Sequence, residues 1–290
     1  MQNNVEIFRT DDNRMIKAFS VDIGANRQGY LWHGNLSLPF SEFEKVMDTP
    51  EIEININQYK FVVDINNLSI HNHLINISVS STTNRLKMIK AYKVDYEASS
   101  IAIMSSQLSR VDLETGFKFS GKNSVDWMIP NNVIEYDEAF VLDIINIIAL
   151  AVGSVVISHA HNKEIIVKDK YTSSQPIYCF PLDKQLSSGI VCKKDNTIRK
   201  KIMRIITDKL MAVKGVAHKA LNDASFHITN QSMTIDVESI LFQQAPMIYP
   251  SDVIQIGSDI GWVDDVSIKC QVSHAGLIIR HTMSIEKRVD

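Results

Sequence analysis

Residues 51–57 read EIEININ and alternate strictly between polar and apolar side chains. Successive side chains of a strand point to opposite faces, so this pattern is typical of a strand with one face in a hydrophobic core. Residues 57–58 can turn the chain, and residues 59–65 can return as a second strand. Isoleucine and valine form about a fifth of the sequence, and both favour strands. We therefore expect a β-rich α+β protein.

Similar alternation recurs in the first third of the chain. Residues 30–38 read YLWHGNLSL, and residues 71–80 read HNHLINISVS. Consecutive strands with one polar face predict an antiparallel meander, which closes naturally as a small barrel or a curved sheet. We assign this β-lobe to residues 1–92.

A change to helical spacing marks a second unit, which we assign to residues 93–172. The strongest helix prediction covers residues 138–152, where apolar positions form one stripe and Gly153 stands where a helix commonly ends. Residues 155–167 then predict a β-hairpin. A shorter helix is predicted over residues 101–108. Helix and hairpin together indicate a small α/β module.

The remaining residues, 173–290, predict a second β-rich lobe with one helix. Residues 171–181 contain two prolines and two serines and suggest a linker, while the polar residues 185–196 suggest a loop. A helix is predicted to begin at Asp208. The last strands are predicted over residues 232–240, 253–256, 261–272 and 276–286.

Composition excludes several classes of protein. The net charge is −3, from 30 basic and 33 acidic residues, so no global field would recruit nucleic acid. The longest apolar stretch, residues 144–157, is shorter than the ~18 residues that a membrane span needs. Three cysteines without a CxxC pair argue against a disulfide framework or a cysteine-based zinc site. We expect no membrane span.

Two His-x-His pairs are the strongest candidates for a metal site. They are His71 with His73, and His159 with His161. Residues i and i+2 of a strand share a face, so either pair could present two imidazoles to one ion. The sequence names no third ligand, and the second pair falls at a predicted hairpin tip. Exposed polar residues explain both pairs better.

Other polar groups also have structural explanations. Glu51 and Glu53 are paired carboxylates, but their alternation with isoleucines favours a solvated or lumen-facing row. Asp11 and Asp12 are predicted to be turn residues, and the basic residues in 199–204 favour a solvated face or a subunit contact. The sequence contains no phosphate-binding, dinucleotide-binding or hydrolase motif. We assign no catalytic, cofactor-binding or metal-binding residue and expect no cofactor and no enzymatic activity.

Four stretches carry a further pattern in chain order. Residues 20–63 include SVDIGANRQGYLWHGNLSLP and PEIEININQYKFVV, residues 126–171 begin DWMIP, residues 208–223 read DKLMAVKGVAHKALND, and residues 246–288 begin PMIYPSDVIQI. Together they resemble phage tail hub (baseplate hub) proteins. The residues that fit the pattern are Trp127, Pro130, Ala149, Gly153, Tyr171, Gly215, Pro250, Trp262, Val266, Glu286 and Lys287.

The resemblance implies tail-tube-like β-barrel lobes flanking the small α/β module. It implies a homotrimer in the virion tail baseplate or tip, assembled in the host cytoplasm. The trimer would join the sixfold tail tube to a threefold central spike or tip protein, with the tape measure protein and other baseplate proteins as further partners. Genomic DNA would pass without specific binding, along channel-lining candidates Glu53 and Asn55. Residues 173–207 are shorter than the family pattern, which suggests a trimmed second barrel.

Two alternatives of other kinds remain at this point. A tail-tip enzyme or carbohydrate-binding module would need convergent polar groups in a pocket, and the sequence nominates none. A tail tube or tail completion protein would normally lack the α/β module.

Overall fold

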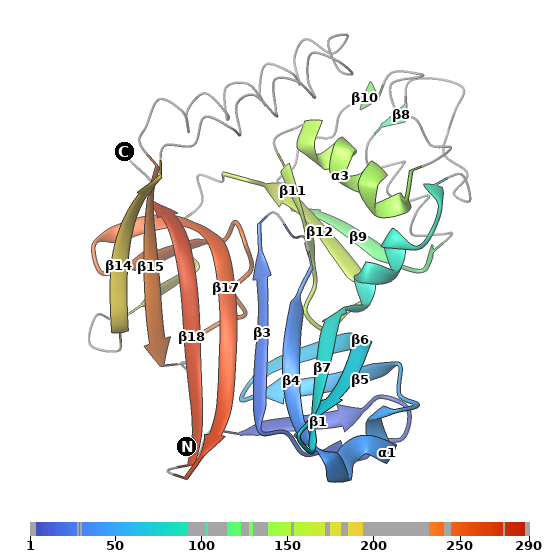
Figure 1. Cartoon of the computed structure of the whole chain (residues 1–290). Helices are drawn as coiled ribbons and strands as arrows, with labels where there is room; N and C mark the ends of the chain where they lie inside the picture. The colour runs from blue at the N-terminus through green and yellow to red at the C-terminus, as the bar shows by residue number, and fades with distance from the viewer. Residues whose placement is uncertain are drawn as a thin grey trace.

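The computed structural model describes residues 4–27, 29, 31–91, 102–103, 115–122, 128–129, 139–151, 154–171, 175–180, 185–193, 232–240, 245–274 and 276–287. A 13-stranded sheet dominates this part of the chain (Figure 1). A two-stranded and a three-stranded sheet complete the β-structure, which confirms the β-rich fold class.

Seven strands from the first third of the chain lie in the order β3-β4-β7-β6-β5-β1-β2. Their bounds are β1 Val5–Arg9, β2 Met15–Ile16, β3 Ser20–Asn26, β4 His33–Pro39, β5 Glu51–Ile56, β6 Tyr59–His71 and β7 Leu74–Ser81. The path ends at β2, which leads after three residues into β3, where the path began. The N-terminal strands therefore form a curled, barrel-like sheet.

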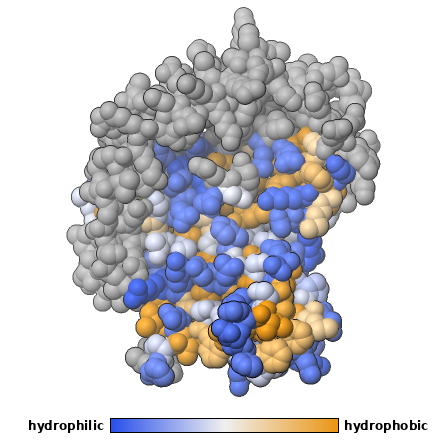
Figure 2. All heavy atoms as spheres, viewed as in Figure 1, coloured by the Kyte–Doolittle hydropathy of each residue, from blue (hydrophilic) through white to orange (hydrophobic). Residues whose placement is uncertain are grey.

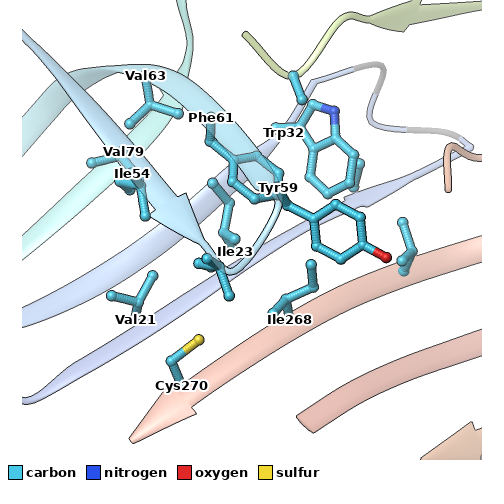
Figure 3. Close-up of a cluster of buried hydrophobic side chains, with 14 of the residues drawn as sticks. Val21, Ile23, Trp32, Ile54, Tyr59, Phe61, Val63, Val79, Ile268 and Cys270 are labelled. Atoms are coloured by element: carbon cyan, nitrogen blue, oxygen red, sulfur yellow. The ribbon is translucent and has the colours of Figure 1, made fainter. Parts of the chain in front are cut away.

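The predicted hairpin over residues 51–65 is confirmed. β5 and β6 pair antiparallel from Ile56↔Tyr59 to Glu51↔Asp64. The turn places Asn57 at a φ of 52°, a left-handed conformation that asparagine tolerates better than most residues. The core beneath includes Trp32, which meets Phe61 edge to face at 5.1 Å (Figure 3).

Short helical segments follow two of these strands, β4 and β7. They are η1 Phe40–Glu42, α1 Phe43–Val46 and η2 Thr82–Lys87. Val46 of α1 and Leu86 of η2 are both buried, so an apolar side chain anchors each of these two segments.

The last four predicted strands are also confirmed. They are β15 Ser232–Ile240, β16 Val253–Ile256, β17 Asp259–Ser273 and β18 Gly276–Lys287. Two predictions nearby were wrong. The polar segment expected as a loop forms β14 Gln185–Lys193, which pairs with β15, and the expected linker contains β13 Tyr178–Phe180, which pairs parallel with β16. Both strands depend on partners distant in sequence, and these pairings override the local polar and proline signals.

One ladder joins the first and last thirds of the chain into a single sheet. β3 pairs antiparallel with β17 from Ser20↔Gln271 to Asn26↔Asp265. Gly24 lies within this ladder, and a Cβ there would approach the Val266 carbonyl oxygen to 2.7 Å. The strands expected in two separate lobes are thus hydrogen-bonded neighbours. The division at residues 1–92, 93–172 and 173–290 stays a prediction.

The α/β module lies above the main sheet in Figure 1. α3 Val141–Ala151 confirms the helix predicted over residues 138–152, and β11 Ser154–Ser158 with β12 Glu164–Asp169 confirms the hairpin. β12 also pairs parallel with β9 Lys118–Lys122. Val141, Ile144 and Ile145 of the helix are fully buried.

The prediction of a shorter helix over residues 101–108 was wrong at residues 102–103. β8 Ala102–Ile103 lies inside residues 101–108 and pairs antiparallel with β10 Met128–Ile129, so a strand partner replaces local helical spacing there. The helix predicted from Asp208, the basic residues 199–204 and the positions Trp127, Pro130, Gly153 and Gly215 lie outside the described residues. Among the helices that the structure describes, none has the length and hydropathy of a membrane span.

Candidate channel-facing row and lobe junction

The two faces of β5 differ as the sequence pattern predicts. Ile52, Ile54 and Ile56 are almost fully buried. Glu53 and Asn55 point to the opposite face and are half-buried. The candidate channel-lining residues therefore lie outside the hydrophobic core, on one polar row.

Neighbouring polar groups hold the Glu53 carboxylate. Lys60 Nζ lies 2.6 Å from Glu53 Oε2, and Asn55 Nδ2 donates to Glu53 Oε1 at 3.0 Å. Burial acts to raise the pKa of Glu53, but the hydrogen bonds from Lys60 and Asn55 outweigh it and hold the pKa below its usual value. Glu53 is thus an ionised, paired carboxylate.

A second ion-paired group continues the row on β5 and β6. Arg85 donates from Nε to Asp64 Oδ2 at 2.8 Å and from Nη2 to Glu51 Oε2 at 2.9 Å. With Glu53 and Lys60, the row holds three carboxylates and two cations. Its local charge is therefore weakly negative, and most of that charge is compensated within the chain.

The hairpin of the α/β module reaches this row. The Val62 backbone N–H donates to the Ala160 carbonyl oxygen at 2.9 Å. Burial and the Lys60 charge lower the pKa of His161, while Glu53 acts in the opposite direction. The hairpin tip thus rests beside the polar row and leaves it half-exposed.

The two His-x-His pairs differ in geometry. His159 and His161 lie edge to face with ring centroids 4.5 Å apart. His71 ends β6, whereas His73 lies in the following turn with a φ of 63°. Within the described part of the chain, no three histidine, cysteine or acidic side chains gather as a metal site would require.

A buried arginine joins three distant parts of the chain. Arg27 Nη2 lies 2.6 Å from Glu286 Oε2 and 2.9 Å from Asp264 Oδ1. Its guanidinium carbon lies 5.2 Å from the ring centroid of Tyr171, which meets Trp262 edge to face at 5.1 Å. Tyr171 and Glu286 therefore contact Arg27 directly, and Trp262 packs against Tyr171. All three residues belong to the pattern described in the sequence. Sequence reasoning missed Arg27, because a lone arginine after a strand carries no local signal.

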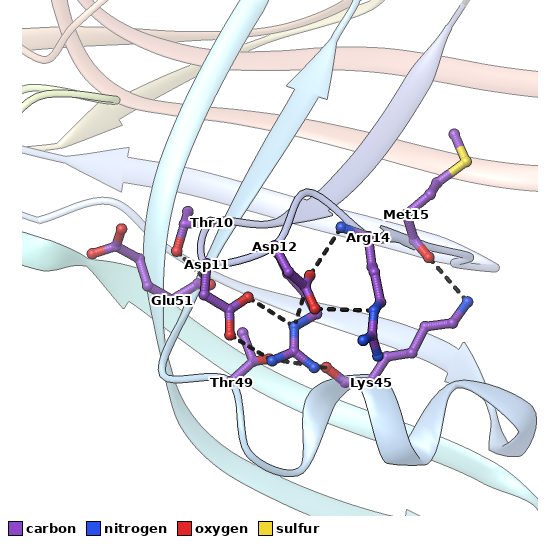
Figure 4. Close-up of polar contacts among 9 residues, drawn as sticks. Thr10, Asp11, Asp12, Arg14, Met15, Lys45, Thr49 and Glu51 are labelled. Atoms are coloured by element: carbon purple, nitrogen blue, oxygen red, sulfur yellow. Dashed lines mark hydrogen bonds and ion pairs between the residues drawn. The ribbon is translucent and has the colours of Figure 1, made fainter.

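The turn between β1 and β2 is tied by a surface ion network (Figure 4). Arg9 Nε donates to Asp11 Oδ1 at 2.9 Å, and Asp12 Oδ2 lies 3.0 Å from Arg14 Nε. The hydrogen bond from Arg9 outweighs desolvation and lowers the pKa of Asp11 to about 2. Both acids lie in the turn, as predicted, and their contacts explain them without a ligand.

Comparison with solved structures gives the fold a context. The tail protein from Neisseria meningitidis MC58 superposes with a TM-score of 0.71 at 10% identity, over 99% of this chain and 96% of that one. The 43 kDa tail protein of prophage MuSo2 from Shewanella oneidensis gives 0.68 at 12% identity, over 98% of both chains. The chain has the fold of phage tail proteins. The resemblance identified in the sequence is confirmed at this level.

This tail-protein fold also occurs in a secretion machine. The E. coli c3393 protein, a component of the type VI secretion system, superposes with a TM-score of 0.62 at 8% identity, over 99% of this chain and 77% of that one. That protein is described as similar to the bacteriophage T4 tail proteins gp27 and gp5. No protein-family model and no curated protein matches the sequence. The likeness therefore lies in the fold.

Proposed function

We propose that the chain is a structural protein of a phage tail, located in the baseplate or tip of the virion. The observation that carries this proposal is the superposition of almost the whole chain on almost the whole of the Neisseria tail protein. Both β-rich parts and the α/β module take part in a match of that extent. A shared isolated motif would not produce it.

Within the tail, we assign the chain the role of a hub. Three copies would form a ring that joins the sixfold tail tube to a threefold spike or tip and surrounds the path of the DNA. The continuous sheet supports this role, because the β3–β17 ladder fixes the N-terminal and C-terminal strands as one body. A rigid subunit suits a ring that must transmit force.

The oligomeric state tests the hub assignment. Mass photometry of the purified full chain should show trimers. A monomer at micromolar concentration, or a ring of six identical copies, would contradict the hub. A cryo-EM map of the parent particle would locate the chain directly, between tube and spike if the assignment is right.

Glu53 and Asn55 are the proposed channel-lining residues. Their row is polar, weakly negative and internally paired, so it offers phosphates little attraction. Glu53→Lys would place unpaired cations beside Lys60 in every subunit of the ring. DNA ejection from such particles should slow, and the delay should shrink as salt is added.

A neutral variant at position 53 distinguishes the effect of an added positive charge from the effect of losing the ion pair with Lys60. Glu53→Gln also removes the ion pair with Lys60, but it adds no cation, so it should change ejection far less than Glu53→Lys. Equal ejection rates for wild type and Glu53→Lys at low salt, in particles shown to contain the variant, would place this row outside the channel.

The proposed role includes no catalysis. Purified chain should leave peptidoglycan and oligosaccharides unchanged, and cleavage of either by the homogeneous protein would contradict a purely structural role.

A further inference from the structure

An apolar groove opens at one end of the N-terminal sheet. Most of its lining residues are apolar. They come from β1 and β2, from residues 17–19 and the start of β3, from the end of β4, and from the tips of β17 and β18. This end is the lower end in Figure 1, and apolar side chains are visible along the same end in Figure 2. The groove therefore lies where distant segments of the chain converge.

The floor of the groove is the hydrophobic core itself. Ile7, Ile16, Val21 and Cys270 line it, and all four are nearly fully buried members of the core. An apolar side chain placed in the groove would extend this core, because its apolar surface would be removed from water as in a core residue.

Large apolar side chains on the rim are exposed to water. Met15 and Phe19 are each 47% exposed, and Val272 is 54% exposed. They belong to different segments that meet here, since the Val272 backbone N–H donates to the Phe19 carbonyl oxygen at 2.9 Å. Contiguous exposure of this kind marks a surface that a partner covers, whereas isolated exposed residues do not.

One strand edge along the groove has no partner among the described residues. The β1–β2 ladder has two steps, Ile7↔Ile16 and Phe8↔Met15, after which the chain leaves β1. Val5 is paired on its other side with Ile56 of β5. Its second edge therefore faces the groove, where an extended segment could add a ladder step.

The charge at the groove indicates the chemistry of its occupant. Of the described residues that line it, Lys17 alone is charged. No described carboxylate forms an ion pair with the Lys17 ammonium. The nearby Glu42 carboxylate accepts from the backbone N–H of Lys17 and pairs instead with Lys45 at 2.7 Å. A lysine with no ion-pair partner among the described residues, beside an apolar floor, complements an apolar segment that carries a carboxylate.

We propose that this groove binds an extended segment of a partner protein, with alternating apolar side chains on the core floor and an acidic residue at Lys17. Backbone pairing along Val5 would orient the segment, and the Lys17 charge would set its direction.

The test uses the full chain and three fluorescent peptides of equal length, measured by fluorescence anisotropy. The first alternates isoleucine with threonine and ends in two aspartates, the second ends in two lysines instead, and the third replaces the isoleucines with serine. The first should bind tightest. Phe19→Asp should weaken its binding by about tenfold or more, and Lys17→Glu should reverse the preference between the first two peptides.

Met88→Asp is the matched control, because Met88 is 77% exposed but does not line the groove. It should leave peptide binding unchanged, and thermal unfolding should show that each variant is folded. Absence of binding by every peptide, or equal binding to wild type and Phe19→Asp, would overturn the proposal. So would self-association of the wild-type chain that Phe19→Asp abolishes while no peptide binds, since the occupant would then be a second copy.

Discussion

Arg27 and Glu286 are 259 positions apart in the sequence, yet their side chains form a 2.6 Å ion pair in which the Arg27 side chain is only 4% exposed. Arg27 follows β3, and Glu286 lies near the end of β18. The pair therefore links the end of β3 to β18 across β17, which pairs with both strands. A buried charge of this kind depends on its partners, because water cannot replace them.

Removal of Glu286 should therefore destabilise the protein strongly. We expect Glu286→Ala to lower the free energy of unfolding by about 3 kcal/mol, as is typical when one partner of a buried pair is lost. Chemical denaturation of the purified variant measures this loss. Lys269→Ala is the matched control, since its pair with Asp22 is exposed (59% and 48%) and should contribute at most about 1 kcal/mol. Equal losses in both variants would contradict a special role for the buried pair.

Gly34 should not tolerate a side chain. A Cβ at this position of β4 would collide with the backbone carbonyl oxygen of Asp22 on the neighbouring strand. A backbone atom within a ladder cannot move without breaking hydrogen bonds, so Gly34→Ala should lower the free energy of unfolding by about 1–3 kcal/mol. Thermal unfolding checks this. Asn35→Ala, at the exposed neighbouring position, should change stability little, and a melting temperature of Gly34→Ala equal to that of Asn35→Ala would show that the strands can separate there.

Ile145 should be essential to the α/β module. The residue is fully buried in α3, which packs against β11. Ile145→Asp would leave an unpaired carboxylate in an apolar environment and should destabilise the module by ~3 kcal/mol or more. Ile145→Val, which removes one methylene group, should cost about 1 kcal/mol. Circular dichroism melts of both variants test the expected ranking. Soluble Ile145→Asp protein with an unchanged melting temperature would mean that this helix face is not core.

His281 should make the protein acid-sensitive. It is 2% exposed on β18, and its ring nitrogens have no hydrogen-bond partner among the described residues. Burial lowers the pKa of His281 to about 4. An unfolded histidine titrates near its ordinary pKa of ~6.5, so the unfolded chain binds this proton first as the pH falls. Stability should decrease between about pH 6.5 and pH 4, by up to ~3 kcal/mol from this residue.

A variant isolates that contribution. His281→Phe removes the titrating group, so its unfolding free energy should fall less steeply across the same pH range than that of wild type. His71→Phe, at an exposed position, should leave the wild-type pH dependence in place. Parallel curves for wild type and His281→Phe would show that His281 is not the source of acid sensitivity.

Local patterns were sufficient to predict the β5–β6 hairpin and α3. Ile52, Ile54 and Ile56 alternate at the strand period, and the stripe through Val141, Ile144 and Ile145 follows the helical period. These patterns report which face is buried. They do not report the partner strand, so the assignment of β14 as a loop was wrong. Its polar sequence becomes a strand only because β15 offers a ladder.

The lobe junction could not be predicted for a related reason. The register of β3 on β17 is set by residues more than two hundred positions apart, and no local signal encodes it. Arg27 likewise has meaning only beside Asp264 and Glu286. By contrast, the alternation of polar and apolar residues was sufficient to predict that Glu53 and Asn55 lie on the face opposite the core. The assignment of that face to a DNA channel stays a proposal, since alternation says which residues are outside the core and not what lies beyond them.

The β3–β17 ladder also has a consequence for how the chain is made. During translation β3 leaves the ribosome well before β17, so the edge of β3 that β17 later covers is open for most of synthesis. An open edge with Val21 and Ile23 on its buried face invites pairing with other nascent chains. Contacts at such sequence distance also slow folding. We expect the N-terminal sheet to mature only after the β17–β18 hairpin has emerged, which makes chaperone protection of the nascent chain important for its yield.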